Sequence, residues 1–382
     1  MALAAPDDRF VCFVDRASAG RLSAYRANIR EVLVKTSADA AQAASSSGYR
    51  SPLDMLAMTR AVSRERLDVF FSPSVYTYFP LPPGLRAVVT IHDAIAERFP
   101  ALTLSSSRAR IFWKAKVKLA LIQARRILTV SEYAATDVAR AHHVSRERID
   151  IAVEAPAADF RRREFDAVNT AAANAGIPPG AGWFIYVGGF SPHKNVPSII
   201  RAHSAVVDKC NGEKPHLLLV GTLDNDVFLG DVPAIRYTID AAGTKDLVHW
   251  PGFVPDVELS ALNTGAIALL LPSAAEGFGL PAVEAAACGA PVIATNESPL
   301  PQLLEGGGIF ITPGDELELA EAMWRLWLNP TLREEMGRRA QLKASEMTWD
   351  RSAHAALESI RMAAGGSTAI LNPGTKTSGA GR

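Results

Sequence analysis

The chain has 382 residues, a net charge of zero and 48% hydrophobic residues, which is a globular composition with room for two domains. This composition excludes extensive disorder, and the balanced charge argues against a dedicated nucleic-acid-binding protein. The three cysteines are far apart in the sequence and form no Cys-x-x-Cys pair, so neither a zinc site nor a disulfide framework is expected. Two acidic residues follow the first six, which argues against a signal peptide, and the longest apolar run, 266–272, is too short for a membrane span. We therefore expect a cytoplasmic protein.

The zero net charge conceals an asymmetry between the two halves. Residues 1–160 hold 22 Lys and Arg against 16 Asp and Glu, whereas residues 161–382 hold 18 against 24. The first half thus carries +6 and the second −6. A basic first half favours an acidic or phosphate-bearing partner on that side.

Short apolar or β-branched runs alternate with helical patterns along the chain. The first series of expected strands is 10–14, 31–35, 68–72, 87–92, 127–131 and 149–153. The second series is 183–188, 216–221, 248–250, 266–271, 291–294 and 309–312. Expected helices include 108–126, 196–208, 282–288, 316–328 and 331–346. Several strands are apolar throughout, as in parallel sheets buried on both faces, so the sequence predicts an α/β protein of doubly wound type.

The two series are separated by a charged, then breaker-rich stretch between about 155 and 180. We expect a first Rossmann-like domain over 1–165, a second over 177–347, a returning helix over 348–362 and a disordered tail over 363–382. The Ala- and Ser-rich residues 37–48 are expected to form a loop.

The most informative segment is 272–289, PSAAEGFGLPAVEAAACG, which follows a buried strand. Ligands of α/β proteins bind at the carboxyl ends of such strands. Gly277 and Gly279 allow a ligand to approach the backbone closely, and the N–H groups of Phe278, Gly279 and Leu280 at a helix start suit a phosphate. Glu276 in the loop and Glu284, expected in the first helical turn, can accept hydrogen bonds from sugar hydroxyls.

Two further strand ends carry polar residues. The run 186–195, YVGGFSPHKN, places Gly189, His193 and Lys194 after a buried strand, and a lysine ammonium suits a leaving diphosphate. The run 88–93, VVTIHD, places His92 at the end of a strand in the first half, where it could contact a substrate hydroxyl.

Together these motifs resemble the retaining glycosyltransferases of family 4, which have the two-domain GT-B fold. The resemblance covers about residues 68–362. It rests on the acid–seven residues–acid signature, Glu276 to Glu284, and on the Gly-to-Lys-Asn segment, Gly188 to Asn195. The segments 251–259, PGFVPDVEL, 128–132, LTVSE, and 348–350, TWD, add to it. The same motifs resemble those of bacterial polysaccharide mannosyltransferases.

The resemblance implies a role for each of these residues. Glu276 would hold donor-sugar hydroxyls, Glu284 the ribose, and Lys194 the diphosphate together with the amides of 278–280. His92 would reach the donor sugar from the first domain. Residues 252–254, with Phe253 and Val254, would line the base pocket. The family implies front-face transfer with retention of configuration and needs no metal or other cofactor.

The sequence departs from the family in two places. Many relatives carry Arg where His193 stands, so the phosphate clamp would be weaker or would need another cation. The family's first domain also opens with a strand, a Gly-rich loop and a helix. We favour the interpretation that this opening unit is lacking and that 10–14 is a later strand. The alternative assigns Val11–Asp15 and Gly20 to the opening strand and turn.

Two other patterns invite a functional interpretation. Asp224-Asn-Asp226 has the form of a metal-binding motif, although a solvated loop is the better explanation. The stretch 108–126 holds seven basic residues and no acid, and Arg110, Lys114, Lys118 and Arg125 share one helical face bordered by Trp113 and Val117. This face could contact anionic lipid at the inner side of the plasma membrane.

The sequence thus predicts transfer of a hexose, with mannose as one candidate, from a nucleotide-sugar donor to a glycan or lipid-linked acceptor. Such a reaction serves surface polysaccharide or glycoconjugate synthesis. Two alternatives stay open: a catalytically impaired glycosyltransferase-like protein, and a sugar-nucleotide epimerase on a similar fold.

Overall fold

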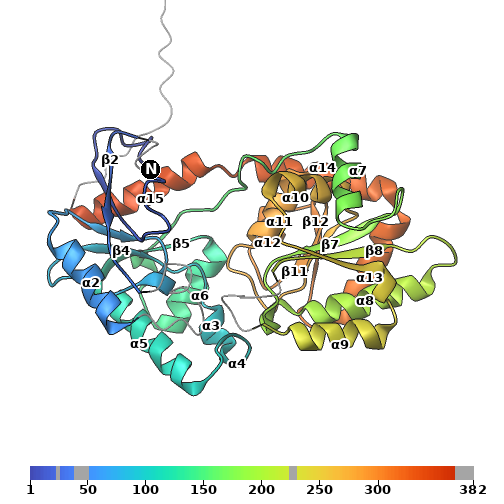
Figure 1. Cartoon of the computed structure of the whole chain (residues 1–382), viewed down its shortest axis with the longest axis horizontal. Helices are drawn as coiled ribbons and strands as arrows, with labels where there is room; N and C mark the ends of the chain where they lie inside the picture. The colour runs from blue at the N-terminus through green and yellow to red at the C-terminus, as the bar shows by residue number, and fades with distance from the viewer. Residues whose placement is uncertain (23–25, 38–50, 223–229, 366–382) are drawn as a thin grey trace, which may run out of the picture.

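Two groups of parallel strands, one from each half of the chain, organise the computed structural model, which describes residues 1–22, 26–37, 51–222 and 230–365 (Figure 1). The second half forms a six-stranded sheet in the order β12-β11-β10-β7-β8-β9. Its strands are β7 (Trp183–Val187), β8 (His216–Val220), β9 (Val248–Gly252), β10 (Leu269–Leu271), β11 (Val292–Thr295) and β12 (Gly308–Ile311). β7, β8, β10 and β11 are almost entirely buried, as their apolar sequences predict.

The strands of the first half fall into two separate parallel sheets, β1-β2 and β3-β4-β5-β6. They are β1 (Phe10–Val14), β2 (Ile29–Leu33), β3 (Phe70–Ser72), β4 (Ala87–Thr90), β5 (Ala124–Thr129) and β6 (Ile149–Ile151). Gly20, between β1 and β2, adopts a positive φ of 81° as a turn glycine does. The described part of this connection, 15–22 and 26–28, contains no helix.

Helices link the strands in both halves. In the first half they are α2 (Pro52–Ser63), α3 (Ile95–Arg98), α4 (Pro100–Thr103), α5 (Ser107–Gln123) and α6 (Glu132–His142). The second half has α7 (Phe165–Asn174), α8 (Val196–Lys209), α9 (Val232–Ala242), α10 (Asp256–Gly265), α11 (Leu280–Ala287), α12 (Leu300–Leu303), α13 (Glu316–Leu328) and α14 (Pro330–Ser345). No helix of the described residues is both long enough and apolar enough to cross a membrane.

The last helix, α15 (Trp349–Ala364), returns from the second half and packs against β4, β5 and β6 of the first (Figure 1). Its Ala356 and Ala363 are buried against Val88 and Leu128 of that sheet. Ser359 donates a 2.6 Å hydrogen bond to Asp150, which also pairs with Arg126. The end of the chain therefore ties the two halves together.

Some sequence-based boundaries were wrong. The helix expected over 108–126 ends at Gln123, because Ala124–Thr129 pairs as a strand with β4. Arg125 therefore lies on β5 and does not belong to the helical basic face. Glu284 is the fifth residue of α11 and not part of its first turn. The last helix continues to Ala364, two residues into the expected tail.

Three sequence predictions concern residues outside the ranges that the structure describes. Asp224-Asn-Asp226, residues 38–48 of the expected loop and residues 366–382 of the expected tail all lie outside the described residues.

Close packing of α14 on the end of α11 fixes the helix that carries Glu284. A Cβ on Gly337 of α14 would lie 2.1 Å from the carbonyl oxygen of Gly289, just past the end of α11. Gly289 itself has φ of 85°, which ends the helix as the sequence predicts.

We expect Gly337→Ala to lower the free energy of unfolding by about 1–3 kcal/mol, since overpacking outweighs the roughly 1 kcal/mol that alanine gains over glycine in a helix. Urea unfolding monitored by circular dichroism measures this difference. Gly212→Ala is the matched control, because no atom lies within 4 Å of its added Cβ. A Gly337→Ala protein as stable as the control would contradict this account of the packing.

Candidate functional site

Two of the predicted motifs meet at the carboxyl edge of the second sheet because β7 and β10 are neighbours. The turn after β7 contains a short 3-10 helix, Pro192–Lys194, and the loop after β10 leads into α11. The N–H of Ala274 donates to the carbonyl of His193 at 2.8 Å, which joins the two loops. The sequence motifs around Lys194 and Glu276 thus form one site.

A buried ion pair lies at the centre of this site. Lys194 Nζ is 2.7 Å from Glu276 Oε1, and Ser273 Oγ donates to the same oxygen at 2.6 Å. Glu276 is only 6% exposed, and the Lys194 side chain is 20% exposed. An ion pair so shielded from water interacts more strongly than one on the surface. The second carboxylate oxygen, Oε2, has no hydrogen-bond partner among the described residues.

Glycines bring the backbone of the two halves into contact beside this pair. A Cβ on Gly277 would lie 2.6 Å from the carbonyl oxygen of His92 and 2.8 Å from Cβ of Asp93. Ser131, which caps the start of α6 in the first half, donates a 2.7 Å hydrogen bond to the Gly277 carbonyl. The loop after β4 therefore abuts the loop after β10, and the structure brings the His92 strand end together with Glu276 and Lys194.

Both histidines of the site are held neutral. Burial and the adjacent Lys194 together lower the pKa of His193 to about 4, against the opposing effect of Glu276. Burial also lowers the pKa of His92, against the opposing effect of Asp93. His193 Nδ1 is buried without a hydrogen-bond partner among the described residues. Lys194 is therefore the cation of these loops at neutral pH.

The start of α11 offers the free amides predicted from the sequence. Gly279 is the N-cap residue with φ of 85°, and Pro281 occupies the first turn. Within the described chain, the N–H groups of Phe278, Gly279 and Leu280 donate to no other residue. They add partial positive charge to the same edge of the sheet.

Glu284 and Glu154, at the border of the site, have strongly raised pKa values. Burial raises the pKa of Glu284 to about 7, and Asp256 and Glu154 add to the shift. Burial likewise raises the pKa of Glu154 to about 7, with a contribution from Asp93. Glu154 lies after β6 in the first half and was not recognised in the sequence, because a single acid that belongs to no motif carries no local signal.

Other predicted site residues lie around the edge. The carbonyl of Gly189 accepts a hydrogen bond from the Tyr186 hydroxyl. Gly188 lies against Gly221, and a Cβ added to Gly221 would lie 2.2 Å from the Gly188 carbonyl oxygen. After β9, Phe253 is 73% exposed, whereas Val254 is buried.

An ion-pair network missed by the sequence analysis crosses between the halves nearby. Arg98 of α3 donates to Asp137 and to Glu297, the latter in the loop after β11, with both distances 2.6 Å. Tyr133 donates to the same Glu297 carboxylate at 2.8 Å. These bonds lower the pKa of Glu297, those from Arg98 most. Because its members are far apart in sequence, no motif could reveal the network.

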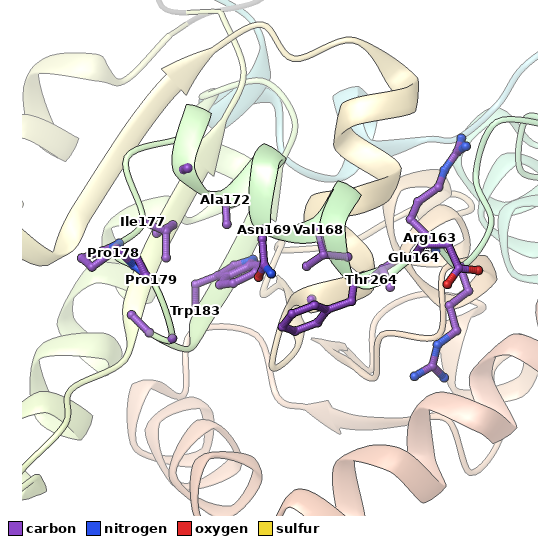
Figure 2. Close-up of a pocket in the computed structure, with 16 residues that line it drawn as sticks. Arg163, Glu164, Val168, Asn169, Ala172, Ile177, Pro178, Pro179, Trp183 and Thr264 are labelled. Atoms are coloured by element: carbon purple, nitrogen blue, oxygen red, sulfur yellow. Dashed lines mark hydrogen bonds between the residues drawn. The ribbon is translucent and has the colours of Figure 1, made fainter.

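A pocket of about 830 Å³ lies elsewhere, between the start of α7 and the end of α10 (Figure 2). Figure 2 shows Arg163, Val168, Trp183 and Thr264 around it. None of the site residues predicted from the sequence lines this pocket. Among the residues that the structure describes, no group of three or more His, Cys, Asp or Glu is placed to hold a metal ion.

Comparison with known families matches both halves of the chain. Residues 169–343 match the model described as Glycosyl transferases group 1, and residues 14–152 match Glycosyltransferase Family 4. The chain is 26% identical over 284 residues to O-antigen chain mannosyltransferase B of Escherichia coli, covering 74% of this chain and 71% of that protein. It spans only 33% and 52% of the length of two D-inositol 3-phosphate glycosyltransferases that it also matches.

Solved structures confirm the predicted fold. Sucrose-phosphate synthase from Thermosynechococcus elongatus has a TM-score of 0.73 at 18% identity, covering 94% of this chain and 90% of that one. Anabaena Alr3699/HepE in complex with UDP-glucose has a TM-score of 0.62 at 20% identity, covering 81% and 76%. The two-domain GT-B architecture expected from the motifs is therefore the fold of this protein.

The acidity of Glu284 predicts a pH-dependent stability. Folding raises the pKa of Glu284 from its ordinary value of 4.5 to about 7. The protonated carboxyl therefore contributes fully to the free energy of unfolding below pH 4.5, and this contribution is lost as the pH rises through about 7. We expect the Tm of the wild type relative to Glu284→Gln to fall by roughly 2–4 °C between pH 5 and pH 8.

Differential scanning calorimetry across this range measures the effect. Glu321→Gln, on the exposed face of α13, is the control and should follow the wild type at every pH. A constant difference between the wild type and Glu284→Gln would show that Glu284 does not titrate on folding as stated.

Proposed function

Because the chain belongs to the GT-B glycosyltransferases of the group 1 and family 4 type, we propose that it moves a hexose from a nucleotide-sugar donor to a glycan or lipid-linked acceptor, with retention of configuration. The single observation that best supports this proposal is the Lys194–Glu276 pair at the strand ends, facing the His92 loop of the first half. It provides one cation and one carboxylate in a sheltered place where a diphosphate and a sugar could lie side by side.

The donor diphosphate would lie between Lys194 and the start of α11. The Lys194 ammonium and the free N–H groups of 278–280 stabilise the charge that develops on the leaving nucleotide. Since His193 is neutral and stands where many relatives carry Arg, Lys194 is the principal cation of these loops. Charge stabilisation by these groups needs no metal or other cofactor, and we propose that none takes part.

The donor sugar would lie over Glu276. Its partnerless Oε2 can accept a hydrogen bond from a sugar hydroxyl, while Lys194 and Ser273 hold Oε1 in place. His92 approaches from the first half and is neutral, so one ring nitrogen can accept a hydrogen bond and the other can donate. These contacts hold one face of the sugar. The acceptor then attacks the anomeric carbon from the same side as the nucleotide leaves, and this retains the configuration.

The nucleoside would extend along the rim. Glu284 accepts hydrogen bonds from the ribose hydroxyls, and Gly189, Phe253 and Val254 border the base. The exposed ring of Phe253 offers a surface on which a base can stack.

Mannose is our candidate for the hexose because an O-antigen mannosyltransferase of Escherichia coli is a relative over most of this chain. That relationship also favours a role in surface polysaccharide or glycoconjugate synthesis. The protein would act in the cytoplasm, at the inner face of the plasma membrane if its acceptor is lipid-linked.

Replacing either member of the central pair tests the proposal. We expect Lys194→Ala and Glu276→Ala each to lower donor turnover at least about tenfold, because each removes a group that binds the reacting part of the donor. The donor is first identified by thermal shift with GDP-, UDP- and ADP-sugars, since a bound donor raises Tm. Turnover is then measured by release of the free nucleoside diphosphate.

Lys245→Ala and Glu321→Ala, both at exposed positions, are the matched controls and should leave turnover unchanged. Unchanged turnover in both site variants would refute the site. A wild type that binds a donor but never turns it over with any acceptor would instead favour the catalytically impaired alternative.

The surface of α5 supports contact with an anionic membrane. Lys114 and Lys118 are exposed on this helix, as are the apolar side chains of Ile111, Phe112 and Ile122. The structure corrects the predicted face, since Trp113 and Val117 are buried in the core and Arg110 Nε is buried. Exposed apolar residues beside cations are typical of a surface that lies at a lipid interface.

We expect the protein to co-sediment with vesicles that contain acidic phospholipid and to bind neutral vesicles at least several-fold less. Lys114→Glu with Lys118→Glu should abolish that difference, because each lysine near the surface contributes about 1 kcal/mol. Lys209→Glu with Lys245→Glu, in the second half, is the charge-matched control. Binding that depends neither on acidic lipid nor on the α5 lysines would exclude this surface.

A further inference from the structure

The backbone around Glu276 is held by hydrogen bonds on both sides of its side chain. The Glu276 N–H donates at 3.0 Å to the carbonyl of Glu297, which lies in the loop after β11. The carbonyl of the next residue, Gly277, accepts the 2.7 Å hydrogen bond from Ser131 of the first half. The placement of the Glu276 carboxylate therefore depends on the loop after β11 as well as on its own loop.

The loop after β11 is itself held by the first half. Glu297 Oε2 accepts a hydrogen bond from Arg98 Nη2 at 2.6 Å and another from the Tyr133 hydroxyl at 2.8 Å. Arg98 Nη1 donates to the Tyr133 hydroxyl at 2.7 Å and to Asp137 at 2.6 Å. A single exposed ion pair contributes little, but here one guanidinium joins three acceptors, and the side chains of Arg98 and Asp137 are only 28% and 13% exposed. This network fixes Glu297 relative to α3 and α6.

Arg98 also belongs to a segment that reaches the turn of Lys194. α3 begins three residues after His92, and α3 and α4 lie at the border of the first half with the second (Figure 1). α4 contacts the turn Pro192–Lys194. Helices of four residues have little stability of their own, so contacts with their surroundings decide where they lie. The hydrogen bonds of Arg98 therefore hold this segment against the second half.

We propose that Arg98 and Tyr133 are positioning residues for Glu276 and that they act through Glu297. They hold the loop whose carbonyl fixes the Glu276 amide, so the Glu276 carboxylate is correctly placed only while the first half is docked against the second. The proposal rests on the sugar-transfer function proposed above, in which Glu276 holds the donor sugar.

The backbone anchor matters most when a donor is bound. Lys194 then serves the diphosphate as well as Glu276, so its ammonium holds Glu276 Oε1 less firmly. The hydrogen bond from the Glu276 amide to Glu297 does not compete with the donor and keeps the carboxylate over the sugar. A displacement of about 1 Å in a group that contacts the reacting atoms can lower the rate by up to about 100-fold.

Amide hydrogen exchange by NMR tests the positioning without any turnover. We expect the Glu276 amide to exchange at least about tenfold faster in Arg98→Ala and in Glu297→Gln than in the wild type, because the loop that accepts its hydrogen bond is released. The Ile267 amide, which donates to the Trp183 carbonyl in the core of the second half, reports general stability and should keep its rate. An unchanged Glu276 amide, or equal acceleration of both amides, would overturn the proposal.

Steady-state kinetics separates positioning from donor binding. Arg98→Ala should lower kcat about tenfold and change the donor KM less than about threefold, because Lys194 and the amides of 278–280 still bind the diphosphate. Arg98→Lys keeps the charge but loses the fork that reaches three acceptors, so it should restore only part of the rate. In a Glu276→Ala background, Arg98→Ala should cost less than about twofold more, since the group that it positions is gone. Arg201→Ala removes an arginine–glutamate pair on α8 and is the matched control, with kcat unchanged.

Two kinetic results would overturn the positioning role: full turnover in both Arg98→Ala and Glu297→Gln, or a tenfold loss that persists in the Glu276→Ala background. A wild type without turnover would instead refute the sugar-transfer function. The exchange rate of the Glu276 amide would then decide the positioning by itself.

Discussion

The contact of Gly277 with the loop after β4 is the constraint on which the site depends. Because Gly277 has no side chain, its backbone meets the His92 carbonyl and Asp93 directly, and the Ser131 hydroxyl donates a hydrogen bond to the Gly277 carbonyl. Any larger residue would force the two halves apart at the point where their strand ends face each other. The Arg98–Glu297 pair and the return of α15 hold the same arrangement from other sides. Residues of both halves can therefore act on one ligand.

Burial at this junction sets the charges of the site. It keeps His92 and His193 neutral and raises the pKa of Glu154 and of Glu284 to about 7. Lys194 stays paired with Glu276, so the ligand-free site is electrically balanced at its centre. A diphosphate entering such a site meets a fixed ammonium and helix amides, with little water to screen them. The same low-dielectric surroundings make the arrangement sensitive to the loss of either member of the pair.

Much of this site could be predicted from the sequence. Residues 183–187 and 269–271 are apolar runs, and the glycine-rich segments after them had to lie at strand ends. The start of α11 at Gly279–Pro281 and its end at Gly289 follow from the backbone preferences of glycine and proline, which can be recognised in the sequence alone. Failures came where tertiary pairing competes with local preference. The end of α5 is an example, because residues 124–126 are taken into the sheet beside β4.

The sequence by itself determined the α/β class, the strand-end motifs and the family, because each depends on residues close together in the chain. Only the tertiary structure decided which strand ends are neighbours, that Glu154 lies near Glu284, and that Arg98 reaches Glu297. It also separated the strands of the first half into two sheets, a feature that hydrophobic pattern does not encode. The physical reason is that hydrogen bonds between strands and electrostatic fields in buried sites act between residues distant in sequence, and only folding sets those distances.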